Sequence, residues 1–245
     1  MRRTMVVLAG SLAGAGCSSG GSHGGTIDAA PASDAAVDAP PDVPPDAPVD
    51  ATCQETLLVG GAPIATQDWT LTTQAPQTII SDPTTDYVAI QTSTPMGGQT
   101  SGQALLVRAQ ALQPGQPFKL QVVMLVQAVN PHNQLDSAAA IMASFTPSVG
   151  NPTDRSEMIY LDSAKVGWAD DSKPGFAFNV LDGNYHTYVL AVDAAGNAQL
   201  TVDGAAAVTR TNFTTNGTIA IGDQTNDPNV DSTLRVRSVI KLCTN

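Results

Sequence analysis

Glutamate is nearly absent from this sequence: among 245 residues, only Glu55 and Glu157 occur. Hydrolysis of glycosidic bonds usually needs two carboxyl groups that flank the scissile bond, one of which stays protonated near neutral pH. The nearest approach to a strand with paired carboxylates runs from Glu157 to Asp162, and strand alternation places these two groups on opposite faces. Any catalytic acid would therefore have to be an aspartate, and we predict no catalytic residue.

Histidine and aromatic residues are also scarce. The histidines are His23, His132 and His186, and no Gly-x-Ser-x-Gly sequence occurs, which argues against a serine hydrolase triad. His186 alternates with apolar residues at the start of an expected strand, so we interpret it as a hydrogen-bonded structural imidazole. Aromatic residues make up 4% of the chain, which limits the side chains that could form a platform for a sugar ring.

Positive charge is sparse and forms no basic run. The net charge is −11, and the part after residue 52 holds nine Lys and Arg residues against sixteen Asp and Glu residues. An acidic surface repels a phosphate backbone, so we expect no nucleic-acid partner.

The apolar stretch at the N-terminus, Met5–Ala15, is too short to cross a bilayer. It leads into Gly14-Ala15-Gly16-Cys17, which resembles the signal of bacterial lipoproteins, although Gly14 stands where such signals usually carry leucine. The resemblance implies that residues 1–16 are removed, that Cys17 is lipidated, and that lipid is the only contact with the membrane. Ser18 after the cysteine implies the outer membrane or cell surface of a Gram-negative bacterium. An ordinary signal peptide that leaves Cys17 unmodified is the alternative.

Residues 17–52 predict a disordered linker, rich in Gly and Ser at first and then in Asp, Pro and Ala. Aspartate recurs at every fourth position, at Asp34, Asp38, Asp42, Asp46 and Asp50. Proline between these positions blocks helix and sheet hydrogen bonding, and the like charges repel one another. The segment is therefore expected to be an extended tether rather than a calcium-binding repeat, which would need glycine.

Residues 53–245 predict one all-β domain, because short apolar stretches alternate with Gly and Pro turns and no helical periodicity persists. We expect an antiparallel two-sheet sandwich, a jelly roll. The expected strands are 54–59, 69–72, 87–92, 104–109, 117–129, 139–145, 158–161, 166–168, 176–180, 185–193, 199–204, 218–221 and 234–242. In the last of these, the alternation places Leu234, Val236, Ile240 and Leu242 toward the core.

The strand from Tyr185 to Asp193 is the clearest element. It is followed by a second strand that ends in Asp203-Gly204, and later by Ile219-Ala220-Ile221-Gly222-Asp223. This series resembles the laminin-G-like branch of the concanavalin A-like lectin and glucanase superfamily. The resemblance implies a jelly roll that binds carbohydrate or, less often, hydrolyses it.

Two cysteines bracket the predicted domain. With Cys17 assigned to lipid, Cys53 and Cys243 remain as partners for each other, and a disulfide suits an exported protein. Two unpaired thiols are the alternative.

Four residues are candidates for ligand binding, and three for calcium. Tyr160 shares a strand face with Asp162, Trp168 ends the next strand, and Tyr185 faces away from His186. For each of them, packing in the core is the alternative interpretation. Asp223, Asp227 and Asp231 provide hard oxygen ligands in one loop, but they lack the spacing of a calcium loop, so we expect no metal or other cofactor, with calcium as the alternative.

Together these patterns predict a lipid-anchored, monomeric surface protein whose jelly roll binds carbohydrate or another surface polymer without catalysis. A glycan hydrolase on the same fold and a purely structural envelope protein are the alternatives.

Overall fold

The computed structural model describes residues 53–73, 78–92, 103–133, 135–146, 157–170, 174–227 and 229–244. All of them belong to one compact unit. The predicted signal segment, Cys17 and the acidic tether lie outside the described residues. Within these ranges, no helix is long and apolar enough to cross a membrane.

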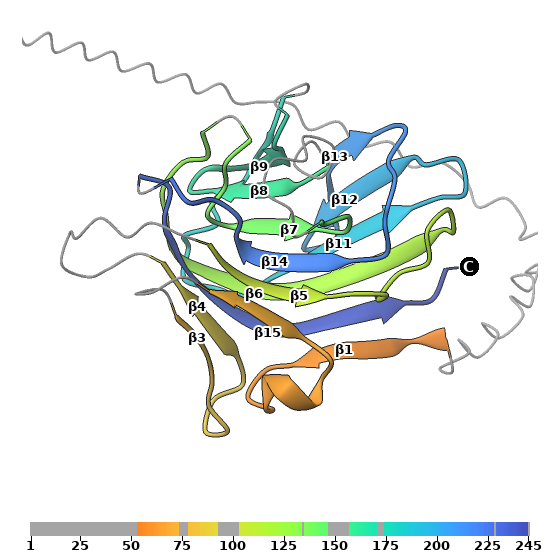
Figure 1. The fold of residues 1–245 in the computed structure, drawn as a ribbon. Helices are drawn as coiled ribbons and strands as arrows, with labels where there is room; N and C mark the ends of the chain where they lie inside the picture. The colour runs from red at the N-terminus through yellow and green to blue at the C-terminus, as the bar shows by residue number, and fades with distance from the viewer. Residues whose placement is uncertain are drawn as a thin grey trace, which may run out of the picture. The chain divides into compact units, whose positions relative to one another are not determined.

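One sheet, here called sheet A, contains eight strands (Figure 1). Its strands lie side by side in the order β13-β12-β11-β6-β15-β4-β3, and β1 pairs with the second half of β15. Its strands are β1 (Glu55–Val59), β3 (Thr78–Ser81), β4 (Val88–Gln91), β6 (Phe118–Val129), β11 (His186–Val192), β12 (Ala198–Val202), β13 (Ala205–Arg210) and β15 (Ser232–Leu242).

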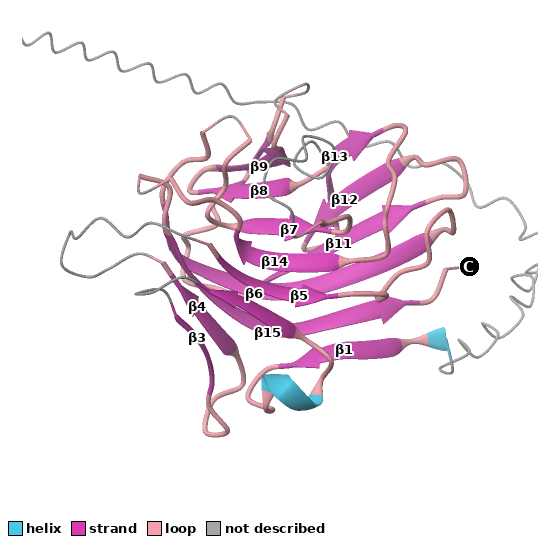
Figure 2. Cartoon of the chain, in the orientation of Figure 1, coloured by secondary structure: helices cyan, strands magenta, loops and turns pink. Residues whose placement is uncertain are grey.

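The second sheet, sheet B, contains seven strands in the order β10-β9-β8-β7-β14-β5-β2. Every strand pair in both sheets is antiparallel, and the short 3₁₀ helix η2 (Ile64–Thr66) lies between β1 and β2 (Figure 2). The predicted all-β two-sheet sandwich is therefore confirmed. The strands of sheet B are β2 (Thr70–Thr73), β5 (Ala104–Arg108), β7 (Ala140–Met142), β8 (Ile159–Asp162), β9 (Lys165–Trp168), β10 (Phe176–Ala177) and β14 (Ile219–Asp223).

Strand β11 shows how the sequence produces the core. Its residues alternate between buried and half-buried positions, because successive side chains of a strand point to opposite faces. Tyr188 and Leu190 thereby reach the same apolar cluster as Ile159 and Ile221 of sheet B. This cluster fills the space between the two sheets.

The inward pattern predicted for β15 is only half right. Leu234 and Val236 are buried in the core as expected, but the register shifts between Val236 and Ser238. This β-bulge adds one residue to the strand and so exchanges the two faces beyond it. Val239 therefore enters the core, whereas Ile240 is only half-buried.

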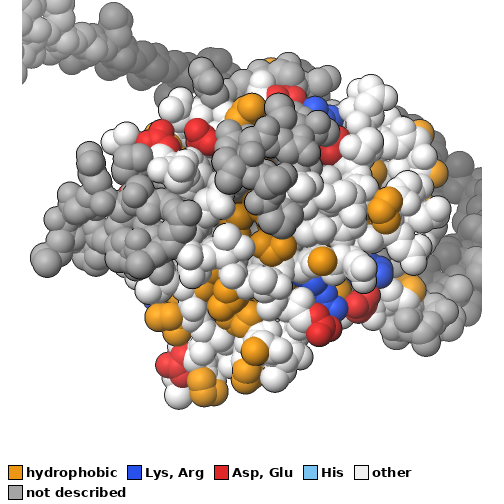
Figure 3. All heavy atoms as spheres, viewed as in Figure 1, with side chains coloured by type: hydrophobic (Ala, Val, Ile, Leu, Met, Phe, Trp, Pro, Cys, Tyr) orange, Lys and Arg blue, Asp and Glu red, His pale blue; other side chains and the backbone are white. Residues whose placement is uncertain are grey.

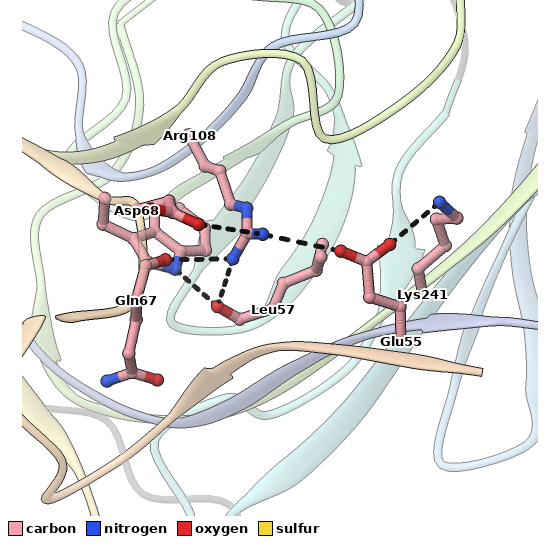
Figure 4. A network of polar contacts seen from close by, with 7 residues as sticks. Glu55, Leu57, Gln67, Asp68, Arg108 and Lys241 are labelled. Atoms are coloured by element: carbon pink, nitrogen blue, oxygen red, sulfur yellow. Dashed lines mark hydrogen bonds and ion pairs between the residues drawn. The ribbon is translucent and has the colours of Figure 1, made fainter.

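The predicted disulfide joins Cys53 and Cys243, whose Cα atoms are 5.2 Å apart, and so links the segments next to β1 and β15. Glu55 lies close by and accepts a hydrogen bond from Lys241 Nζ at 3.0 Å (Figure 4). Arg108 donates to the carbonyl oxygens of Leu57 at 2.8 Å and Gln67 at 2.9 Å. In Figure 3, acidic and basic side chains accordingly lie next to one another beside β1. Glu55 is thus a structural ion-pair partner at the edge of the domain.

Candidate functional site

Two of the four ligand candidates meet on the face of sheet B that points away from the core. Tyr160 and Asp162 both project from β8, and the ring of His132 stacks on the Tyr160 ring with their centroids 3.8 Å apart. His132 also donates its backbone N–H to Asp162 Oδ1 at 2.8 Å, and its Nδ1 lies 2.8 Å from Asp162 Oδ2. Tyr160 lies across Gly167, where an added Cβ would be 2.5 Å from the Tyr160 hydroxyl.

The rest of this outer face is largely apolar, apart from Lys165, whose Nζ lies 5.3 Å from the centroid of the Tyr160 ring. Next to Tyr160, the central strands contribute Leu105, Val107, Ala140, Met142 and Ala220 to a second buried cluster. Tyr160 itself is 1% exposed, so its ring faces are taken up by protein packing.

Trp168 fills the core instead. Ile159 pairs with Trp168 across β8 and β9, and directly opposed residues share one face of a sheet. Because Ile159 faces the core, Trp168 does too, where it is 1% exposed and donates Nε1–H to the carbonyl of Thr209 at 3.1 Å. This position separates Trp168 from Tyr160 by the thickness of the sheet.

Tyr185 lies on the outer face of sheet A. The guanidinium of Arg237 lies 3.7 Å from the centroid of its ring, and Arg235 lies 4.5 Å from the centroid of Tyr87. Arg237 Nε is 2.7 Å from Asp86 Oδ2. Burial raises the pKa of Tyr185, and the negative charge of Asp86 raises it further. We call these five residues, Asp86, Tyr87, Tyr185, Arg235 and Arg237, the Arg–Tyr patch.

A cavity of about 760 Å³ lies beside the start of β6, the end of β11, the start of β12 and the end of β13. We call it the strand-end cavity. Phe118, Val192 and Ala198 supply apolar surface, and amide, hydroxyl and charged side chains surround it. The polar lining consists of Lys119, Asp193, Asn197, Gln199, Thr209, Arg210, Thr211 and Thr244. Its volume lies within the range typical of small-molecule sites, about 300–1,000 Å³.

Asp193 is the only carboxylate among the described residues that line the strand-end cavity. The Asn197 side chain donates to Asp193 Oδ2 at 2.8 Å, and the backbone N–H groups of Asn197 and Ala195 donate to Oδ1. These hydrogen bonds, first those from Asn197, lower the pKa of Asp193 because they stabilise its ionised form. Asp193 is therefore an acceptor and not a proton donor at neutral pH.

The carboxyl group with the opposite behaviour is Asp223, at the end of β14. It is 1% exposed, and burial raises its pKa to about 8, against the opposing hydrogen bonds from Thr92 and Thr225. Its Oδ1 accepts the backbone N–H of Thr225 at 3.0 Å, whereas Oδ2 has no hydrogen-bond partner. Asp223 does not line the strand-end cavity, so the cavity does not combine an ionised carboxylate with a protonated one.

The three calcium candidates do not converge. Asp227 accepts hydrogen bonds from both the backbone and the side chain of Asn229, while the backbone of Asp231 donates to Asn130. Across the described ranges, no three His, Cys, Asp or Glu side chains are close enough together to hold a metal ion.

His186 has the structural role that its place in the sequence predicted. Its Nδ1 lies 2.7 Å from Asp203 Oδ2, and its Nε2 lies 2.9 Å from Asp182 Oδ1. The imidazole therefore joins the turn after β12 to the loop before β11. Because both ring nitrogens are hydrogen-bonded to carboxylates, His186 stabilises this part of the fold.

Comparison with known proteins finds similarity in three dimensions only. No protein-family model matches the sequence, and no curated protein sequence matches it. The carbohydrate recognition domain of Emp47p aligns over 80% of this chain and 99% of its own, with a TM-score of 0.52 and 10% identity. A carbohydrate esterase of the Shiga toxin-encoding bacteriophage phi24B aligns over 78% of this chain and 100% of its own, with a TM-score of 0.51 and 14% identity.

The exoplasmic/lumenal domain of VIP36, in a Ca²⁺-bound form, aligns over 80% of this chain and 94% of its own, with a TM-score of 0.51 and 10% identity. The protein thus has the concanavalin A-like jelly-roll fold that its sequence resembled. At these identities the likeness concerns the fold alone.

Proposed function

We propose that this jelly roll binds a carbohydrate polymer without cleaving it, and that the strand-end cavity is the binding site. The observation that carries the proposal is the chemistry of the cavity lining. The Gln199 amide and the hydroxyls of Thr209 and Thr211 can donate and accept hydrogen bonds, as sugar hydroxyls require. Phe118 and Val192 provide an apolar surface for the C–H face of a sugar ring.

The protonation of the carboxyl groups supports binding over hydrolysis. Glycosidases commonly use two carboxyl groups about 5–9.5 Å apart, one of them protonated. The described lining of the cavity contains Asp193 alone, and hydrogen bonds keep this residue ionised. Asp223, whose raised pKa would suit an acid, is sealed from solvent elsewhere in the fold.

The similar structures support carbohydrate as the class of ligand. One is named as a carbohydrate recognition domain and another as a carbohydrate esterase, so both names refer to carbohydrate. The names disagree on catalysis, and we therefore rest the non-catalytic part of the proposal on the cavity itself.

The same proposal assigns a place to the protein. Cys17 carries the lipid anchor at the surface of the outer membrane, and the Asp- and Pro-rich residues up to 52 hold the jelly roll away from it. A single binding domain on such a tether would act as a monomer and retain a polymer at the cell surface.

Affinity electrophoresis in gels that contain β-glucan, glycol chitin or galactan tests the proposal. At least one polymer should retard the protein without release of reducing ends. Ala191→Trp fills the cavity from β11 and should weaken binding about tenfold or more, the equivalent of ~1.4 kcal/mol. Thr201→Trp, on β12 outside the cavity, is the matched control and should bind like the wild type.

Three results would contradict the proposal. They are an absence of retardation by every polymer, equal retardation of the Ala191→Trp protein, and release of reducing ends. If reducing ends appear and are lost in Asp193→Asn or Asp223→Asn, the hydrolase takes its place.

A further inference from the structure

We propose that the Arg–Tyr patch is a second binding site, distinct from the strand-end cavity, which takes the carboxylate or sulfate groups of an acidic polysaccharide. It goes beyond the proposed function in naming a separate site and a charged ligand. It rests on that function only for the choice of a polysaccharide.

The patch is assembled across four neighbouring strands of sheet A. Arg235 faces Leu125 of β6 on one side and Ala89 of β4 on the other. Tyr185 immediately precedes His186, which pairs with Met124 of β6, so Arg237 reaches over β6 to lie on the Tyr185 ring. A flat strip of arginine and tyrosine thus covers the outer face between β4 and β11.

Arg237, which stacks on Tyr185, lies at the bulge in β15. The register shift lies between Val236 and Ser238, so Arg237 is the extra residue of the strand. Bulges commonly redirect a side chain next to a functional site. Asp86 contacts the Arg237 guanidinium through Nε, so the two terminal nitrogens of Arg237 are not used in this ion pair.

Both guanidinium groups retain unused donors. Within the described part of the chain, the Arg235 guanidinium makes no ion pair or hydrogen bond, and the only polar partner of the Arg237 guanidinium is Asp86. The Arg237 side chain is 43% exposed, so its free N–H groups face water. A guanidinium is a planar fork that matches the two oxygens of a carboxylate or sulfate, and stacking on tyrosine fixes the fork in advance.

Three other cationic side chains of the domain are paired with carboxylates. Arg108 and Lys241 are paired with Glu55, and Arg210 lies 2.6 Å from Asp170. Against a net charge of −11, two neighbouring arginines, of which only Arg237 is paired with a carboxylate, form a local positive patch.

The same net charge selects the kind of polyanion. Duplex DNA carries about one charge per 1.7 Å, so an acidic protein strongly repels it. A polysaccharide with at most one acid group per sugar ring has a lower charge density, and the repulsion is correspondingly weaker. Two arginines also suit one or two acid groups rather than a dense row of phosphates.

The test compares polymers that differ only in their acid groups. Polygalacturonate should retard the full-length protein in affinity electrophoresis at least about tenfold more than the same polymer with its carboxyls reduced to alcohols. Dextran sulfate with at most one sulfate per sugar ring, compared with neutral dextran, forms the sulfate arm. Arg235→Gln and Arg237→Gln should each weaken the acid-dependent retardation about tenfold, and added salt should weaken it in the wild type.

Two matched variants separate recognition from charge. Lys241→Gln removes one positive charge at a distant ion pair and should leave the retardation unchanged. Arg237→Lys keeps the charge but loses the fork, and should lose most of the acid-dependent retardation. Thermal unfolding of each variant shows whether it is folded, and Arg235→Gln should keep the wild-type retardation by neutral polymers.

The outcomes separate the two proposals. If Ala191→Trp loses neutral-polymer binding while the arginine variants lose only acid-dependent binding, both sites stand. If no neutral polymer binds but polygalacturonate or dextran sulfate binds through Arg235 and Arg237, only the cavity proposal fails. Equal retardation by acidic and neutral polymers, or an equal loss in Lys241→Gln, overturns the second site.

Discussion

Replacing Asp223 with asparagine should stabilise the protein at neutral and alkaline pH and have little effect near pH 4. The carboxyl group is 1% exposed at the rim of the sandwich, and its Oδ2 has no hydrogen-bond partner. Ionisation in this position leaves a charge without water, so the folded state keeps the proton. Asparagine preserves the acceptor for the Thr225 backbone and removes the charge.

The magnitude follows from proton linkage. Burial, as the largest cause, raises the pKa of Asp223 from 3.8 to about 8 in the folded state. Between about pH 4 and pH 8 the folded state therefore binds a proton that the unfolded state has released, so stability falls as the pH rises. Each pH unit costs about 1.4 kcal/mol at most, and the whole interval amounts to about 5 kcal/mol.

Urea unfolding of the wild type and Asp223→Asn at pH 4, 6 and 8 measures this difference. The free energies of unfolding should be similar at pH 4, and by pH 8 the variant should be more stable by several kcal/mol, with about 5 kcal/mol as the upper limit. Asp68→Asn, at a side chain that is 89% exposed, should follow the wild-type pH profile. Parallel pH profiles for the wild type and Asp223→Asn would refute the assignment of a buried protonated acid.

Two further predictions concern covalent chemistry. Cys53→Ala should lower the free energy of unfolding by about 5 kcal/mol on the loop-entropy model, because the disulfide to Cys243 spans a separation of 190 residues. Chemical denaturation measures this loss, and an unchanged midpoint would speak against it. Cys17→Ser should abolish lipid labelling and release the protein from the membrane fraction, whereas labelling that persists in the variant would rule out the lipoprotein assignment.

The strands that could be predicted are those whose period-two pattern is uninterrupted. β11 alternates from His186 to Val192, and the structure places these residues as the alternation requires. The edge strand β3 was missed, because its two central residues, Ile79 and Ile80, are both apolar and show no alternation. Its pairing with β4, the next strand along the chain, makes it a strand.

The relative positions of candidate site residues could be predicted only for residues that lie on the same strand. Tyr160 and Asp162 are two residues apart on one strand, so they had to share a face. Trp168 was correctly placed on the neighbouring strand, but its face depended on the register, in which it opposes Ile159 and not Tyr160. A shift of one residue in the register would exchange the faces.

The sequence by itself determined the fold class, and it predicted the pairing of Cys53 with Cys243 and a hydrogen-bonded His186. These features depend on alternation, turn chemistry and the choice of available partners, all of which can be read along one chain. The tertiary structure decided the functional surfaces. Arg237 meets Tyr185 because the strand order places β15 next to β6 and β6 next to β11, and the acidity of Asp223 depends on how completely distant segments exclude water from it.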